Sequence, residues 1–286
     1  MSTWSPSRAR MLQRQSPLRE QERAENFPVA LRILPAQLRA DLRAVYDVVR
    51  VIDELGDSAP GDRTTQLVDF AGDLATVWDG GTPQASVLRR LTPTVLRRGL
   101  TQQPFQDLVE ANLQDQHVVS YQTFDELMQY CGLSAAPIGR IVLQIVGAGS
   151  PEQQDLSDQV CCALQLVEHW QDVAEDRRAG RVYLPQDDLG HFGVPTPDLD
   201  ADRATPALRQ LIFFETDRAE ALLDSGAVLV GALAGWGRLA VAGYVAGGRA
   251  AIDSLRRVHG DVLGSTPQVR RRDVGRHLVV ELRRAS

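Results

Sequence analysis

Residues 34–57 read LPAQLRADLRAVYDVVRVIDELGD, and their apolar side chains recur at steps of three and four residues. An α-helix has about 3.6 residues per turn, so this spacing places the apolar side chains in one stripe along a helix. The stretch therefore predicts a helix that faces a hydrophobic core, and it should stop at Gly56, ahead of the turn-rich SAPGD. The predicted stripe consists of Leu38, Leu42, Val45, Val49 and Ile52.

The rest of the chain continues in the same way, without obvious alternating strand patterns or internal repeats. Thr123 is a candidate helix cap, with Glu126 three residues later, and Pro137 should kink the helix that follows. The fold class predicted is all-α: a single-domain helical bundle over 23–286, after a polar, flexible N-terminal segment 1–22. A long loop rich in Pro, Asp and Gly is predicted over 183–206, and long loops of this kind are often functional, often lids. Helices are predicted over 63–80, 84–100, 104–119, 123–148 and 152–178, with two or three more at the C-terminal end.

Composition narrows the classes of function. The net charge of −6 argues against a nucleic-acid groove, and arginine carries all the fixed positive charge because lysine is absent. Three cysteines form neither a disulfide framework nor a zinc-ligand pattern, and they are expected to be small buried residues. The N-terminus lacks a signal-peptide core, and no run of about 18 apolar residues occurs, so a cytoplasmic protein is expected. The apolar stretch 226–248 is interpreted as buried helices, with peripheral membrane contact as the weaker alternative.

Two acidic patterns suggest chemistry. In EHWQDVAEDRRAGRVYLP (168–185), Glu168, Asp172 and Asp176 recur at every fourth residue, where like charges destabilise an isolated helix by a few tenths of a kcal/mol per pair. A solvated acidic face is one interpretation. A second acidic pair, Asp53 and Asp57, ends an otherwise apolar stretch, where a surface face is less expected.

If the two acidic stations faced each other across a bundle, shared Mg²⁺ ions would relieve their repulsion. Magnesium takes its remaining ligands from water and substrate phosphates, and nearby arginines could hold a diphosphate. Departure of diphosphate leaves a carbocation, which an apolar pocket would protect from random quenching. The candidate arginines are Arg50, Arg177, Arg178 and Arg181.

Several ordered segments resemble the squalene/phytoene synthase family, the head-to-head trans-isoprenyl diphosphate synthases, over roughly residues 25–265. The resemblance implies an isoprenoid-synthase bundle with a central substrate cavity. The segments that carry it are ENFPVALRILP (25–35), YDVVRVIDELGD (46–57), YCGLSAAPIGRIVLQIVG (130–147), QLVEHWQDVAEDRRAGRVYLP (165–185), RAEALLDSGAVL (218–229) and AGGRAAIDSLRRV (246–258).

Within this family, the chain is most similar to the bacterial hydroxysqualene synthases. Phytoene-type and presqualene-type enzymes usually have an Asn-x-x-Arg-Asp core in the second motif, whereas this chain has Trp170-Gln171-Asp172. ENFP (25–28) and LQDQHVVSYQTFDEL (113–127) support the same branch. The resemblance implies that presqualene diphosphate, supplied by a sister enzyme, ionises and rearranges before water captures the cation to give hydroxysqualene.

That reaction needs no NAD(P)H, and no G-x-G-x-x-G fingerprint is present in the sequence. One alternative is a sibling enzyme that condenses two prenyl diphosphates into presqualene diphosphate or a phytoene- or dehydrosqualene-type product. The alternative of another class is a non-catalytic prenyl-lipid-binding protein or assembly factor. A prenyl diphosphate substrate also suggests work at the inner face of the membrane.

The resemblance also implies roles for individual residues. Two or three Mg²⁺ ions would be bound by Asp53, Asp57, Glu168, Asp172 and Asp176. Diphosphate oxygens would be held by Arg50 and Arg181, and the reacting centre would be bordered by Tyr46, Tyr130 and Tyr183. Phe27 would pack near the reacting end of the substrate, and Gln165 would line the channel below motif two.

Two residues of the acidic motifs depart from the family pattern. Glu54 stands where a second Asp is more frequent, and Glu168 stands where Asn is common. Both substitutions keep oxygen ligands available, but they could alter the number or position of metal ions. His169, between two candidate ligands, is predicted to lie on another helix face, at the surface or in packing, rather than to act as a base.

Overall fold

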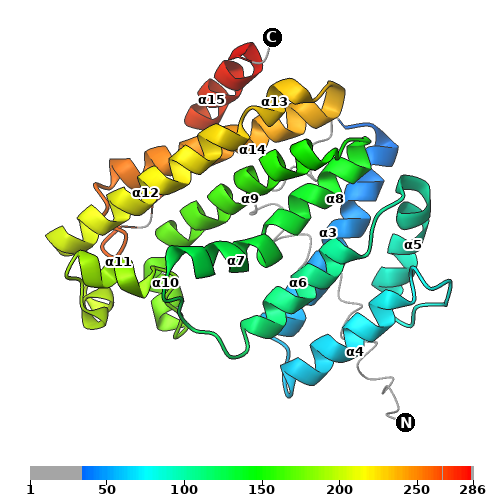
Figure 1. Ribbon diagram of the computed structural model, residues 1–286, viewed down its shortest axis with the longest axis horizontal. Coiled ribbons are helices and arrows are strands. Elements are labelled where there is room, and N and C mark those ends of the chain that lie inside the picture. The colour runs from blue at the N-terminus through cyan, green and yellow to red at the C-terminus, as the bar shows by residue number, and fades with distance from the viewer. Residues whose placement is uncertain (1–33, 266, 285–286) are drawn as a thin grey trace. The chain divides into compact units, whose positions relative to one another are not determined.

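The computed structural model describes residues 34–265 and 267–284, and these confirm the all-α fold class (Figure 1). Within these ranges, β pairing is limited to one parallel bridge between Ser120 and Val182. None of the described helices is long and apolar enough to cross a membrane. The described residues form two compact units. Unit 1 holds those up to Gln116 together with Gln144–Gly147, and unit 2 holds His117–Leu143 and those from Ala148 onward. The single-domain organisation stays a prediction.

Unit 1 is built around α3, Ala36–Asp57, which contacts each of the other helices of the unit. Its predicted stripe is largely confirmed, because Leu38, Leu42, Val45 and Ile52 are buried and Val49 is half-buried. The helix passes Gly56 and ends one residue later. A Cβ at Gly56 would lie 2.0 Å from Asn112 Oδ1, so glycine permits the close approach of α6. The other helices are α4, Arg63–Ala75, α5, Ser86–Arg98, and α6, Gln103–Gln114.

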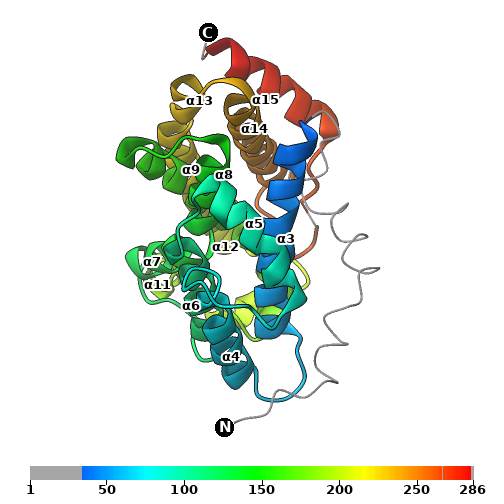
Figure 2. The same cartoon turned by 90° about the vertical axis from the view of Figure 1, so that its right-hand side faces the viewer.

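Unit 2 contains the longer helices. α9, Pro151–Gln171, packs against α12, Pro206–Gly226, and α14, Gly235–Arg257, packs against both of them. A Cβ at Gly226 would lie 2.8 Å from Leu156 O, so this glycine lets α12 approach the α9 backbone. Figure 2 shows α13, Leu229–Ala232, and α15, Arg271–Arg284, beside α14.

The predicted helix over 123–148 divides in two, as Pro137 indicated. α7 spans Phe124–Ser134 and α8 spans Ala136–Val146, with the break at Ala135. Proline has no backbone N–H to donate, and its ring clashes with the preceding turn of a helix. The break therefore lies just before Pro137. The Thr123 cap is confirmed, because its side chain accepts a hydrogen bond of 3.1 Å from the backbone N–H of Glu126.

The predicted loop over 183–206 is more ordered than its composition suggested. It contains α11, Gln186–His191, and the 3₁₀ helix η2, Thr196–Asp200. Proline precedes both elements and suits the start of a helix, where its missing N–H costs nothing. Arg218 on α12 donates to Asp188 Oδ2 at 2.7 Å, which fastens α11 to α12. In the described residues that follow, four helices, α12 to α15, are present rather than two or three.

Candidate functional site

The acidic row of unit 2 lies at a junction between two helices. α9 ends at Gln171, Asp172 has φ −103° and ψ 13°, and α10 spans Val173–Arg178. The prediction of one helix over 152–178 is therefore wrong. Helical hydrogen bonds nevertheless continue through the junction: the Asp172 N–H donates to Glu168 O at 3.0 Å, and the Asp176 N–H donates to Asp172 O at 2.9 Å. The three acids consequently remain on successive turns.

Asp172 is half-buried at the centre of this row. Burial, and then the charges of Glu168, Asp176 and Glu175, raise the pKa of Asp172 to about 6, while His169 opposes the shift. Its ionised form is thus disfavoured by the protein's own environment. A divalent cation would reverse that preference, so the donor set fits a hard metal ion.

The acids do not form a closed metal cage. In the part of the chain that the structure describes, no group of three or more His, Cys, Asp or Glu side chains could hold a metal ion. Magnesium commonly binds through one or two carboxylates and completes its octahedron with water and phosphate oxygens. An open row of carboxylates is therefore compatible with an ion that takes its other ligands from outside the protein.

Next to the acidic row, His169 belongs to an aromatic cluster. The residue is 6% exposed, and its imidazole stacks on the ring of Tyr183, with centroids 3.7 Å apart and planes 14° apart. Tyr130 lies with its ring centroid 6.4 Å from that of His169 and 5.9 Å from that of Tyr183, and Tyr121 packs against both tyrosines. Of the two expected places for His169, the surface or the packed interior, the structure shows the packed interior, and its ring partners are two of the predicted site residues.

The polar atoms of His169 link two further site residues. Gln165 Nε2 lies 3.2 Å from His169 Nε2, and His169 Nδ1 lies 3.8 Å from Asp176 Oδ2. With the Gln165 amide in this orientation, its nitrogen donates to Nε2, and a neutral ring would then carry its proton on Nδ1, the nitrogen nearer Asp176. A cavity of about 10 Å³, room for about one water molecule, adjoins this contact. Its lining includes His169, Asp176, Arg181 and Tyr183.

The acidic station of unit 1 lies in the last turns of α3. Asp53 is half-buried and Asp57 is exposed, while Tyr46, two turns before Asp53, is buried. Arg50 Nη1 lies 3.9 Å from Asp53 Oδ2, within ion-pair distance. Asp53 and Asp57 belong to unit 1, whereas the acidic row belongs to unit 2. That these two groups of acids face each other therefore stays a prediction. Phe27 lies outside the described residues.

Two further expectations concern Arg177 and the cysteines. Arg177 forms a two-pronged ion pair with Asp200 of η2, at 2.8 and 2.7 Å, so this arginine anchors α10 to η2. Burial raises the pKa of Cys161 and Cys162 to about 12 and raises that of Cys131 as well, consistent with unreactive thiols.

Sequence reasoning missed the position of His169. It placed this residue on another helix face from the candidate ligands, whereas the side chain lies beside Gln165 and Asp176. The sequence did contain one signal for this position. A histidine one helical turn after Gln165 is close enough to contact the Gln165 amide.

Comparison with known proteins gives consistent matches. The family model described as Squalene/phytoene synthase matches residues 21–273. Hydroxysqualene synthase of Rhodopseudomonas palustris is 34% identical over 208 residues, covering 71% of this chain and 70% of the relative. That of Zymomonas mobilis is 35% identical over 205 residues, covering 70% and 67%. Phytoene synthase of Mycobacterium tuberculosis is 34% identical over 201 residues, covering 68% and 66%.

Solved structures give the same picture. Squalene synthase HpnC from Alicyclobacillus acidocaldarius is 36% identical, covers 89% of this chain and 97% of its own, and has a TM-score of 0.77. A dehydrosqualene synthase solved in complex with ligand has a TM-score of 0.83 at 22% identity, and it covers 96% of both chains. At that identity the second likeness speaks for the fold alone.

Proposed function

Because the chain belongs to the squalene/phytoene synthase family, we propose that it is a hydroxysqualene synthase, converting presqualene diphosphate and water into hydroxysqualene and diphosphate. The observation that carries the proposal is the acidic row of Glu168, Asp172 and Asp176. It adjoins the His169 aromatic cluster in a chain that matches several hydroxysqualene synthases over about two thirds of its length.

Magnesium fits the donor set described above. In unit 2, one or two carboxylates from among Glu168, Asp172 and Asp176 would bind each ion, and Asp53 and Asp57 would do so in unit 1, for two or three ions in all. When bound, the metal supplies positive charge that offsets the negative charge of the departing diphosphate.

The other site residues act on the organic substrate and its leaving group. Arg50 and Arg181 bind diphosphate oxygens as planar donors of fixed charge. Tyr46, Tyr130 and Tyr183 present aromatic rings to the carbocation, which such rings attract through their negative faces. Gln165 and Phe27 line the channel that holds the chain of the substrate.

The reaction balances without a reductant. The bond between carbon and the diphosphate oxygen breaks, and its electron pair leaves with diphosphate. After the cation rearranges, the oxygen of water forms a new bond to carbon, and one proton is released to solvent. Water, rather than hydride, quenches the cation, so NAD(P)H has no role in this step.

A direct assay tests the proposal. Purified protein with Mg²⁺ is incubated separately with presqualene diphosphate and with farnesyl diphosphate, and products are identified by mass spectrometry. Presqualene diphosphate should give a C30 alcohol and free diphosphate. Asp172→Asn or Asp53→Asn should reduce turnover at least 100-fold, whereas Glu175→Gln, at an exposed acid of α10, should leave most of it.

The outcomes separate the alternatives. Activity on farnesyl diphosphate alone would identify the sibling condensing enzyme, which the similarity to phytoene synthase keeps as the second candidate. Full turnover in EDTA would remove the role of magnesium. Binding of prenyl diphosphates without turnover of either substrate would favour a non-catalytic lipid-binding or assembly protein. Presqualene diphosphate as substrate would also imply functional coupling to the sister enzyme that makes it.

A further inference from the structure

Helix α15 separates its charges by sign. Its acids, Asp273 and Glu281, are 9% and 3% exposed, and they pair with Arg257 and Arg249 of α14 at 2.7 Å each. Its arginines are exposed, although Arg276 pairs with Asp253 at 2.8 Å. Arg272, Arg276 and Arg284 also lie 3.9, 4.0 and 3.9 Å from the two buried acids, at the limit of ion-pair distance. The exposed charge of this helix is therefore positive, on a chain whose net charge is −6. The exposed arginines are Arg271, Arg272, Arg276, Arg283 and Arg284.

Large apolar side chains are exposed at the same end of unit 2. On α15, Val279 is 47% and Val280 is 36% exposed, one turn before Arg283 and Arg284. Val228, just before α13, is 65% exposed, and Trp236, in the first turn of α14, is 37% exposed. Arg238 donates to Leu282 O at 2.8 Å and so joins the start of α14 to the end of α15. We call these four apolar residues with Arg276, Arg283 and Arg284 the C-terminal face.

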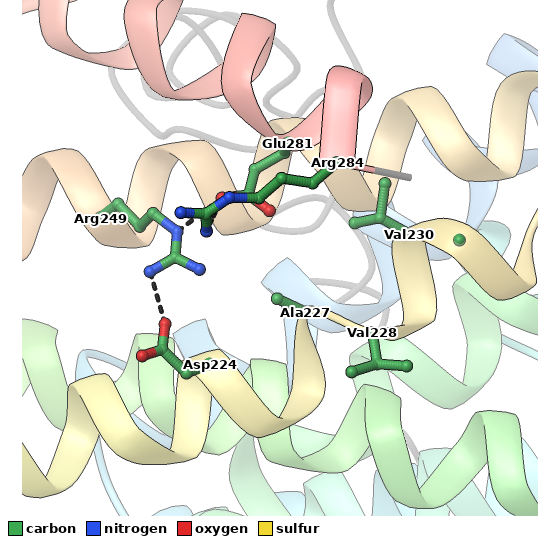
Figure 3. A pocket seen from close by; sticks show the side chains of 8 residues that line it. Asp224, Ala227, Val228, Val230, Arg249, Glu281 and Arg284 are labelled. Carbon is green, nitrogen blue, oxygen red and sulfur yellow. Dashed lines mark hydrogen bonds and ion pairs between the residues drawn. The ribbon is translucent and has the colours of Figure 1, made fainter. Parts of the chain in front are cut away.

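A cavity of about 410 Å³ opens beside this face (Figure 3). Val228 and Val230 form an apolar wall, and Arg284 lies on the side of α15. Inside, Arg249 donates to both Asp224 and Glu281, so its charge is already compensated. The interior therefore does not select an anion, and the attraction for anions comes from the exposed arginines outside it.

We infer that the C-terminal face docks on an anionic lipid bilayer. Apolar and tryptophan side chains enter the boundary between headgroups and acyl chains, while arginines stay among the anionic headgroups. Each basic residue near such a surface strengthens binding. A nucleic acid would use the arginines but leave the two valines and the tryptophan unexplained. A second copy of the chain would bring like charges together.

The inference rests on the proposed function in one respect only. A C30 alcohol partitions into bilayers, so an enzyme that makes one has a reason to bind a bilayer. Binding can be measured without substrate, so a failure of the catalytic proposal and a failure of this inference are distinguishable. The full chain is sedimented with vesicles of phosphatidylglycerol and phosphatidylcholine, and with vesicles of phosphatidylcholine alone. We expect binding to the anionic vesicles that weakens as salt is added.

Matched variants test whether the C-terminal face is the surface that binds the vesicles. Arg283→Gln with Arg284→Gln should weaken binding at least 10-fold, and Val279→Asp with Val280→Asp should weaken it at least as much. Leu96→Asp changes a 77% exposed leucine of α5 and should bind as wild type does. Thermal unfolding of each variant verifies that it is folded. In a Trp4→Phe background, anionic vesicles should shift tryptophan emission to the blue, and Trp236→Phe should abolish the shift.

Several results would overturn the inference. Wild-type protein that stays in the supernatant with anionic vesicles would do so, as would equal loss of binding in Leu96→Asp and Val279→Asp/Val280→Asp. Self-association that the valine variants abolish, without vesicle binding, would assign the face to a second copy. Preferential capture of duplex DNA by the same arginines would assign it to nucleic acid.

Discussion

The imidazole of His169 and the phenol ring of Tyr183 stack nearly parallel, with their centroids 3.7 Å apart. The same imidazole directs Nδ1 toward Asp176, so one side chain adjoins both an aromatic wall and a candidate metal ligand. We predict that His169→Phe keeps the stack, leaves the free energy of unfolding within about 1 kcal/mol of wild type, and lowers kcat roughly 10-fold.

The comparison with His169→Ala separates packing from positioning. His169→Ala removes the ring, so besides lowering kcat it should reduce the free energy of unfolding by about 2 kcal/mol. His191→Phe, at an exposed histidine of α11, serves as the control and should change neither quantity. Steady-state kinetics and urea unfolding supply the measurements. A wild-type kcat in His169→Phe would show that the shape of the ring is all that matters.

Glu168 gives a second prediction, concerning metal. Among neighbouring charges, it contributes most to raising the pKa of Asp172. If Glu168 binds Mg²⁺, Glu168→Gln should raise the Mg²⁺ concentration needed for half-maximal activity about 10-fold. If it only repels Asp172, its removal should leave that concentration unchanged or lower it. A magnesium titration of turnover decides, with Glu175→Gln as the exposed-acid control.

Glu215 predicts how stability depends on pH. Burial, and then a hydrogen bond shared with Asp188, raise the pKa of Glu215 to about 8 from 4.5, while Arg218 opposes the shift. The folded protein thus holds a proton that the unfolded chain releases at lower pH. This contribution to stability is full below about pH 4.5 and is lost as the pH rises through 8.

The neutral variant Glu215→Gln should therefore be more stable than wild type at pH 9, by on the order of 2 kcal/mol, and nearly equal to it at pH 5. Asp217→Asn, at an acid with a side chain 69% exposed on the same helix, should leave the slope unchanged. Urea unfolding at several pH values provides the test. The same slope in Glu215→Gln and wild type would contradict the assignment.

The contact between α9 and α12 predicts a large effect from a small change. Gly226→Ala would place a methyl group 2.8 Å from Leu156 O and from Val160 Cγ2, so the helices must separate. We expect a loss of about 2–3 kcal/mol in unfolding free energy. Gly243→Ala, within α14 and with no atom inside 4 Å of its Cβ, should instead stabilise by about 0.5–1 kcal/mol. Equal effects of both substitutions would refute the packing argument.

Sequence patterns predicted those parts of the molecule that depend on neighbours along the chain. The apolar stripe of 34–57, the Thr123 cap and the break near Pro137 all follow from local rules. The acidic row could be recognised from the sequence because like charges at helical spacing repel each other, so their presence calls for an explanation. The stacking of His169 on Tyr183 was not visible, because the tertiary fold sets the distance between those rings. Helix α11 was hidden by a composition that also suits loops.

The junction at Asp172 divides the acidic row between two helices. Glu168 travels with the long helix α9, whereas Asp176 travels with the six-residue α10, which the pair of Arg177 and Asp200 fastens to η2. Hydrogen bonds still bridge the junction, so the two parts of the row stay on successive turns. Because Asp176 belongs to the segment that Arg177 anchors, a substitution at Asp200 should disturb Asp176 more than Glu168.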